Sequence, residues 1–288
     1  MSKLYVVATP IGNLNDMSKR GIETLENVDL ILAEDTRHTL KLLNSFDIKT
    51  RMEAYHKFNE KKKSNEIIEK MKENEMDIAI VTDAGTPCIS DPGFELVKEA
   101  HENGIEVLGV PGCSAVINAL SISGFDTLSF SFVGFIPREN KELKEFYSMI
   151  EKNETYSIVC YESPKRIIKS LNTMKEYLGD IELAVMSDMT KLFERTYRGT
   201  ISEVLHELEE NNNADKGEYA IALNNKSFHK EAEVVIGNAQ TIEGMIIDEM
   251  TKTGMNMKDA IKAVSEKNKI SKSEVYDASL NLKKMFEK

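Results

Sequence analysis

Short apolar runs alternate with amphipathic helical patterns through the first 110 residues, and this alternation is the feature that most constrains the fold. Four runs are typical of strands buried on both faces, namely 4–8, 28–33, 77–82 and 105–110. Helical patterns lie between them at 18–27 and 59–74. Strands that alternate with helices predict a mostly parallel sheet covered by helices, which is an α/β domain.

A second cycle of strands and helices follows the stretch SISGFDTLSFSFVGFIPREN. Predicted strands cover 129–134, 156–161, 181–187, 193–197 and 218–223. Predicted helices cover 139–152, 164–177 and 202–211, the second opened by a proline in its first turn. Because chains of this length usually split into two cores, we expect one α/β domain at 1–118 and another at 119–228.

The last 48 residues have a different pattern, with helical periodicity only. Three helices are predicted at 242–253, 257–267 and 273–286, separated by short turns. Ser271 with Glu274 three residues later is a capping-box signature for the last of them. Three short helices joined by tight turns predict a helix-turn-helix-like module at 241–288.

The charge balance of the chain also changes at residue 241, where the helical tail begins. The 288 residues contain 37 Lys and Arg against 48 Asp and Glu, a formal net charge of -11. Residues 241–288 hold nine lysines and eight acidic residues, whereas residues 1–240 hold 28 basic and 40 acidic residues. An acidic balance gives no attraction for nucleic acid by itself, and taken alone it favours a small-molecule enzyme.

The three cysteines indicate neither a disulfide framework nor a zinc site. Cys88, Cys113 and Cys160 are an odd, widely spaced set without CxxC spacing, and we expect them to be small buried hydrophobes.

The N-terminal apolar run is too short for a signal sequence, and no stretch approaches the ~20 apolar residues of a membrane span. We therefore expect a cytoplasmic protein.

Three loops that follow predicted strands are rich in Gly, Pro and small polar residues: 8–16, 83–93 and 110–115. Ligands of open α/β sheets bind outside the carboxyl ends of the strands, so three such loops predict one pocket. The first loop fits neither GxGxxG nor GxxxxGK[ST]. Asp83 and Asp91 match no EF-hand spacing, so we expect no metal, and Asp91-Pro92 is also typical of a turn.

Eight segments along the chain resemble the successive motifs of the ribosomal RNA small subunit methyltransferase I family, within the tetrapyrrole methylase superfamily. They are TPIGNLND at 9–16, AEDTR at 33–37, YHKFNE at 55–60, VTDAGTPCISDPG at 81–93, VPGCSA at 110–115, SGF at 123–125, GFIP at 134–137 and YESPKR at 161–166. The resemblance runs from about residue 3 to 225 and continues into the tail. Cys113 stands where the family often has Pro, and Lys165 where it often has His.

The resemblance implies two α/β domains with S-adenosyl-L-methionine (SAM) in the cleft between them. The implied reaction is 2′-O-methylation of a cytidine in the decoding region of 16S rRNA within the 30S subunit, by a homodimer. The positions that match the family's cofactor contacts are Ile11, Asp83, Thr86, Ile89, Ser114, Ala115, Tyr161 and Ala220.

A ribose hydroxyl is a poor nucleophile and benefits from proton removal during attack. Motif-borne candidates for that role are Asp35, Glu34 and His56, with Arg37 a candidate clamp for phosphate or carboxylate. Glu34 and Asp35 are equally compatible with turn residues or with a surface network around Arg37. Apart from the resemblance, His56 between Tyr55 and Lys57 is more typical of a solvated loop histidine than of a base.

Two other functions stay open. A methyltransferase acting on a porphyrin or corrin precursor would usually carry glycine-rich GxGPGD and GGDP loops, which differ from the loops of this chain. A noncatalytic SAM-sensing regulator would use the tail to bind DNA. If RNA is the substrate, the tail is the expected docking segment, because Lys262, Lys267, Lys269 and Lys272 face only Glu266 across eleven residues.

Overall fold

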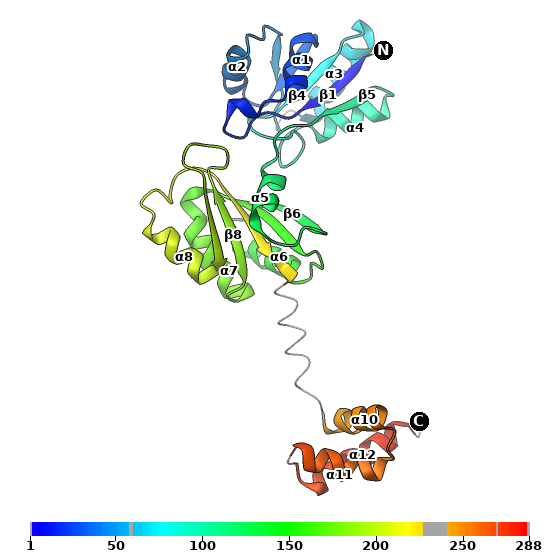
Figure 1. Ribbon diagram of the computed structural model, residues 1–288. Coiled ribbons are helices and arrows are strands. Elements are labelled where there is room, and N and C mark those ends of the chain that lie inside the picture. Colours follow the sequence, from blue (N-terminus) through cyan, green and yellow to red (C-terminus); the bar gives the residue numbers. More distant parts are fainter. Residues whose placement is uncertain (1, 58–59, 227–240, 269, 287–288) are drawn as a thin grey trace. The chain divides into compact units, whose positions relative to one another are not determined.

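The computed structural model describes residues 2–57, 60–226, 241–268 and 270–286. The chain forms two compact units, residues 1–227 and residues 228–288. Within the described residues, no helix is both long and apolar enough to cross a membrane. The first unit contains the two α/β sheets that the sequence predicts, and the second contains the three predicted helices (Figure 1).

The first sheet is entirely parallel, with strand order β3-β2-β4-β1-β5. Its strands are β1 (Lys3–Val7), β2 (Leu30–Ala33), β3 (Met52–Ala54), β4 (Ile78–Val81) and β5 (Glu106–Val110). The helices between them are α1 (Lys19–Asn27), α2 (Thr36–Ser45), α3 (Glu60–Asn74) and α4 (Phe94–Glu102). All carboxyl ends of a parallel sheet lie at one edge, so the loops after β1, β4 and β5 are brought together there.

Both faces of this sheet are buried, because successive side chains of a strand point to opposite faces. Ile78 and Ile80 of β4 pack with residues of α3 and α4, whereas Ala79 and Val81 pack on the other face with residues of α1 and α2. All four residues of β2 are buried. The continuous apolar runs of the sequence are explained by this two-sided burial.

The second sheet is mixed, with strand order β6-β7-β10-β8-β9. Its strands are β6 (Phe130–Phe135), β7 (Ser157–Glu162), β8 (Glu182–Ser187), β9 (Arg195–Thr200) and β10 (Tyr219–Asn224). Only β6 and β7 pair in parallel; the other three pairings are antiparallel. The associated helices are α6 (Asn140–Glu151), α7 (Ile167–Leu178) and α8 (Ile201–Glu210).

Helix α5 (Ala115–Ser123) follows the first sheet in sequence but packs on the second sheet. Its buried residues Val116 and Leu120 share a core cluster with Val159 of β7 and with Ala220 and Ala222 of β10. The expected domain boundary at 118 falls inside this helix, and the domain limits stay a prediction.

The second unit consists of α10 (Ile242–Thr253), α11 (Met257–Asn268) and α12 (Lys272–Phe286) around a small apolar core. The capping box predicted for the last helix is present. The Glu274 backbone N–H donates to Ser271 Oγ at 3.3 Å, and the Ser271 backbone N–H donates to a Glu274 carboxylate oxygen at 3.3 Å. The helix-turn-helix resemblance of this unit stays a prediction.

Several elements of the structure differ from the sequence-based prediction. Helices α2, α4 and α5 and strand β3 were not predicted, and β9 covers Arg195–Thr200 where a strand was predicted at 193–197. That strand was misplaced because Phe193 looks like a strand residue, whereas it is an exposed loop residue, 80% accessible.

Candidate functional site

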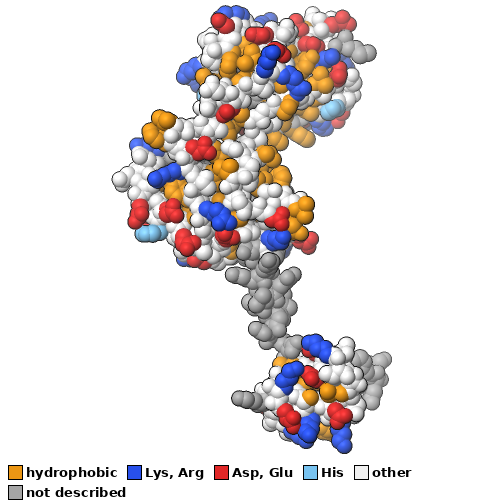
Figure 2. Space-filling model, in the orientation of Figure 1, with side chains coloured by type: hydrophobic (Ala, Val, Ile, Leu, Met, Phe, Trp, Pro, Cys, Tyr) orange, Lys and Arg blue, Asp and Glu red, His pale blue; other side chains and the backbone are white. Residues whose placement is uncertain are grey.

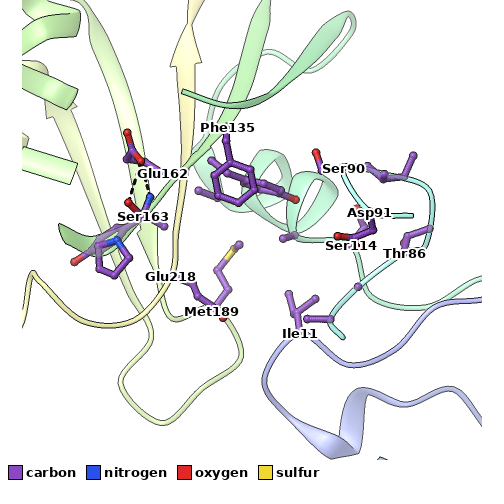
Figure 3. A pocket seen from close by; sticks show the side chains of 18 residues that line it. Ile11, Thr86, Ser90, Asp91, Ser114, Phe135, Glu162, Ser163, Met189 and Glu218 are labelled. Atoms are coloured by element: carbon purple, nitrogen blue, oxygen red, sulfur yellow. Dashed lines mark hydrogen bonds between the residues drawn. The ribbon is translucent and has the colours of Figure 1, made fainter. Parts of the chain in front are cut away.

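A cavity of about 350 Å³ lies in the first unit between the carboxyl-end loops of the first sheet and the strands of the second. Figure 3 shows Ile11, Thr86, Asp91 and Ser114 on one side of it, with Glu162, Ser163, Met189 and Glu218 on the other. The volume is within the range of about 300–1,000 Å³ that is typical of small-molecule sites. Both sheets therefore contribute to one site.

Backbone hydrogen bonds hold two of the loops against each other. Thr9 and Gly85 form an isolated antiparallel bridge, with N···O distances of 2.8 and 3.1 Å. The Thr9 hydroxyl also donates to the Thr82 carbonyl at 3.1 Å. Gly85 has a φ of +90°, a conformation that an L residue adopts only at a cost, and it lies beside Ile11.

The third loop is attached to the second by the Thr86 hydroxyl, which donates to the Cys113 carbonyl at 3.0 Å. Ser114 then caps α5, with its side chain accepting from the Ile117 N–H at 3.4 Å, so Ser114 and Ala115 face the cavity at a helix N-terminus. The prediction that three loops line one pocket is confirmed.

The opposite wall is aromatic where β6 meets β7. Tyr161 packs edge-on against Phe135, with ring centroids 5.3 Å apart, and against Phe132 at 4.9 Å. Burial, followed by repulsion from the Asp91 carboxylate, raises the pKa of Tyr161 to about 12. The phenol is therefore neutral over the physiological range.

Three carboxyl side chains line the cavity, and two of them have cation partners. Glu162 is buried; it pairs with Arg166 at 3.3 Å, accepts from the Ser163 N–H at 2.6 Å and contacts the Ser170 hydroxyl. Glu218 pairs with Lys191 at 2.9 Å. Asp91 forms no ion pair with any residue that the structure describes.

Seven of the eight predicted cofactor residues line this cavity: Ile11, Thr86, Ile89, Ser114, Ala115, Tyr161 and Ala220. Asp83 does not line it; its carboxylate accepts from the Asp35 backbone N–H at 3.2 Å. Cofactor binding by all eight residues stays a prediction.

The predicted catalytic residues Asp35, Arg37 and His56 do not line the cavity. Asp35 is the N-cap of α2 and accepts from the Arg37 N–H at 2.8 Å. The Arg37 guanidinium also donates to Asp35, at 2.8 Å, and these hydrogen bonds lower the pKa of Asp35 well below its usual value. The pairing of Asp35 with Arg37 that the sequence left open is thus present, and the catalytic role of the three residues stays a prediction.

Glu34, the neighbour of Asp35, has the opposite electrostatic environment. It accepts from the Thr82 hydroxyl at 3.1 Å, and burial raises its pKa, with repulsion from Asp91 and Asp83 adding to the effect and His56 opposing it. Glu34 is therefore coupled to a carboxylate of the cavity wall.

Sequence reasoning missed several lining residues, chiefly Asp91, Phe135, Met189 and Glu218. The signal for Asp91 was in the motif VTDAGTPCISDPG, where it was treated mainly as a turn residue. Met189 precedes the loop residues Thr190 and Lys191, which lie against Gly12. Only the fold reveals that this loop reaches the first sheet's loops.

Comparison with known proteins places these features in context. Residues 3–205 match the family model described as "Tetrapyrrole (Corrin/Porphyrin) Methylases". A "Ribosomal RNA small subunit methyltransferase I" of Bacillus subtilis is 40% identical over 96% of this chain and 94% of that protein. A protein of the same description from Thermotoga maritima is 43% identical over 226 residues, which cover 78% of this chain and 100% of that protein.

Solved structures with low sequence identity share the fold. Diphthine synthase superposes with a TM-score of 0.57 at 13% identity, covering 77% of this chain and 90% of that one. Uroporphyrin-III-C-methyltransferase from Thermus thermophilus gives a TM-score of 0.52 at 16% identity, covering 80% and 97%. The predicted α/β architecture is confirmed by these similarities.

Proposed function

The chain belongs to the ribosomal RNA small subunit methyltransferase I family, and from this membership we propose that it methylates the ribose 2′-hydroxyl of a cytidine in 16S rRNA. The proposed methyl donor is SAM, and the proposed substrate is the decoding region within the 30S subunit. The observation that carries the proposal is the cavity, because residues from the three loops at 8–16, 83–93 and 110–115 and from the strands of the second sheet line it.

The residues of the cavity suit SAM. The donor carries a positive sulfonium and an ammonium group, and the wall from the second sheet offers the carboxylates of Glu162 and Glu218. The N-terminus of α5 at Ser114 and Ala115 suits the donor's carboxylate, because helix N-termini attract anions. When bound, SAM supplies a methyl group that is already strongly electrophilic.

The chain's own task is then to position the acceptor and to exclude water. Arg37, Asp35 and His56 are the proposed residues on the acceptor side. The Arg37 side chain is 88% exposed, so a ribose-phosphate group can reach it by exchange with Asp35. A homodimer is the expected assembly, and sedimentation of the purified protein tests it.

The helical unit is the proposed docking segment for the subunit. Lys262 and Lys272 are exposed, Lys267 pairs with Glu249 at 3.1 Å, and Lys269 lies outside the described residues. On the face shown in Figure 2, acidic and basic side chains are interspersed over the described surface of residues 2–226. No described residue of this unit lines the cavity, so we assign the unit to affinity rather than to chemistry.

The decisive experiment is transfer of tritium from labelled SAM to purified 30S subunits, followed by nuclease mapping. We expect label on one cytidine ribose of 16S rRNA and none on 50S subunits, which are the matched control. Label on a porphyrin or corrin precursor offered in the same assay, with none on 30S, would replace the proposal by the small-molecule alternative. SAM binding with no transfer to any acceptor would support the regulator instead.

A truncated chain ending at residue 226 tests the docking segment. The first unit has its own core clusters, so we expect it to bind SAM with unchanged affinity. Its affinity for 30S subunits should fall about tenfold or more at 150 mM salt, with a shallower dependence on salt. Full affinity and an unchanged salt dependence would assign docking to the first unit.

A further inference from the structure

Among the residues that the structure describes, no cation forms an ion pair with Asp91, in contrast to the other two carboxylates of the cavity. Glu162 is committed to Arg166 and two serines, and Glu218 is committed to Lys191. Asp91 follows β4 in the loop before α4 and is partly buried. Figure 3 shows it beside Ser114 and Thr86, across the cavity from Glu162.

The surroundings of Asp91 favour its protonated form. Burial is the main reason that its pKa is raised; the Thr82 hydroxyl opposes this effect, and the Asp83 carboxylate adds to it. Glu34 and Tyr161 also face Asp91, and both feel its negative charge. Repulsion between carboxylates is mutual, so Asp91 has a greater affinity for a proton than an ordinary aspartate.

Thr82 lies between Glu34 and Asp91. Its buried hydroxyl donates to Glu34 at 3.1 Å, and its interaction with Asp91 lowers the pKa of Asp91, against the larger effect of burial. A hydroxyl has one proton to donate and two lone pairs that accept. Once Asp91 is protonated, it can donate to Thr82 while Thr82 continues to donate to Glu34, so the protonated state is hydrogen-bonded.

Asp35 has the opposite properties. Its carboxylate caps α2 and pairs with Arg37, its pKa is lowered, and it does not line the cavity. A carboxylate held in its charged form by these contacts is a weak proton acceptor. General-base catalysis favours the group whose pKa lies closer to the operating pH.

We propose that Asp91 is the catalytic base of the methyl transfer and that Glu34 is a positioning residue, which acts through Thr82 and Asp91. This inference rests on the proposed function. The acceptor's 2′-oxygen forms a bond to the methyl carbon, the carbon–sulfur bond breaks with its electron pair going to sulfur, and the hydroxyl proton goes to Asp91. The products are the methylated ribose, a neutral thioether and a protonated Asp91.

The first test is single-turnover transfer to 30S subunits at saturating SAM with Asp91→Asn. We expect the rate to fall at least about 100-fold, the magnitude typical of a lost general base, with SAM affinity changed less than threefold. The matched control is Asp47→Asn, which makes the same chemical change at an exposed residue beyond α2 and should leave the rate unchanged. Asp35→Asn in parallel measures the rival base.

The second test keeps Asp91 intact and uses the pH profile. In the wild type the rate should rise with pH as Asp91 loses its proton. Glu34→Gln removes a negative charge from the surroundings of Asp91, which also include Asp83, Cys88 and Tyr161. The rising limb of the pH–rate profile should therefore move to lower pH. A variant that merely perturbed the fold would lower the rate without moving that limb.

The outcomes are distinct. A wild type that labels no 16S rRNA contradicts the proposed function and this inference with it. If the wild type is active, an Asp91→Asn rate within fivefold of the wild-type rate overturns the inference. A loss of rate that a higher SAM concentration restores also overturns it, because Asp91 would then be a cofactor ligand. An unmoved limb in Glu34→Gln overturns the role given to Glu34.

Discussion

The two walls of the cavity are built by different means. The wall from the first sheet consists of loops that backbone groups hold together, as in the Thr9–Gly85 bridge. The wall from the second sheet consists of side chains on strands, such as Tyr161 and Glu162. The first wall therefore depends on backbone conformation, whereas the second depends on a side-chain network.

The network of the second wall continues beyond Glu162. Arg166, which pairs with that buried carboxylate, also donates to the carbonyls of Ile136 at 3.1 Å and Pro137 at 2.7 Å. These carbonyls belong to the segment directly after β6, which ends at Phe135 of the cavity wall. One buried charge thus fixes the position of an aromatic lining residue.

The largest expected effect comes from breaking this network. Glu162→Ala leaves Arg166 without its carboxylate, and loss of one partner of a buried pair costs about 3–5 kcal/mol. We expect the lower end, about 3 kcal/mol, because the Arg166 side chain is 25% exposed and keeps two carbonyl acceptors. The loss in the free energy of unfolding is measured by urea denaturation.

The matched control is another Glu–Arg pair on the same sheet. Glu182 and Arg198 lie 2.9 Å apart with side chains 33% and 45% exposed, so Glu182→Ala should cost about 1 kcal/mol or less. Equal losses from the two variants would show that burial does not distinguish the pairs.

The backbone-built wall is tested at Gly85. Alanine there meets a φ of +90° and places a Cβ 3.4 Å from Ile11 Cγ2, so we expect a stability cost of about 1–2 kcal/mol and roughly tenfold weaker SAM binding. Gly104→Ala is the control, since its φ is +70° with no atom within 4 Å of the added Cβ. Its stability cost should be similar and its SAM affinity, measured by calorimetry, unchanged. Equal affinities for both variants would contradict the first wall's dependence on this glycine.

The difference between the walls also explains what the sequence could predict. The first sheet's loops were recognised because Gly, Pro and strand-end position are local signals, and both sheets' buried strands were found from apolar runs. Helix α5 was missed because AVINALSIS is apolar on nearly all sides, and only its packing on the second sheet reveals its place.

Electrostatic roles were harder to predict than position. Asp35 and Asp91 are the same residue type in equally specific motifs, yet one is paired with an exposed Arg37 and the other faces a cavity beside acidic groups. The cation neighbour of Asp35 is local, two residues along the chain, whereas Glu34 and Tyr161 reach Asp91 from distant parts of the sequence. No spacing rule contains the second kind of information.

The smallest expected effect tests the aromatic part of the second wall through pH. Because the folded protein holds the pKa of Tyr161 at about 12, against about 10 for an unfolded tyrosine, the unfolded chain binds fewer protons between these values. Stability therefore falls as pH rises from 10 to 12, and Tyr161→Phe should make this fall shallower in urea denaturation at each pH. At neutral pH the phenol is uncharged and the ring contacts with Phe135 persist in the variant, so SAM affinity should change less than threefold. Tyr161→Ala, which removes the ring, should weaken SAM binding about tenfold. An unchanged pH slope in Tyr161→Phe would mean that the phenol is more solvated than its place between Phe135 and Asp91 implies.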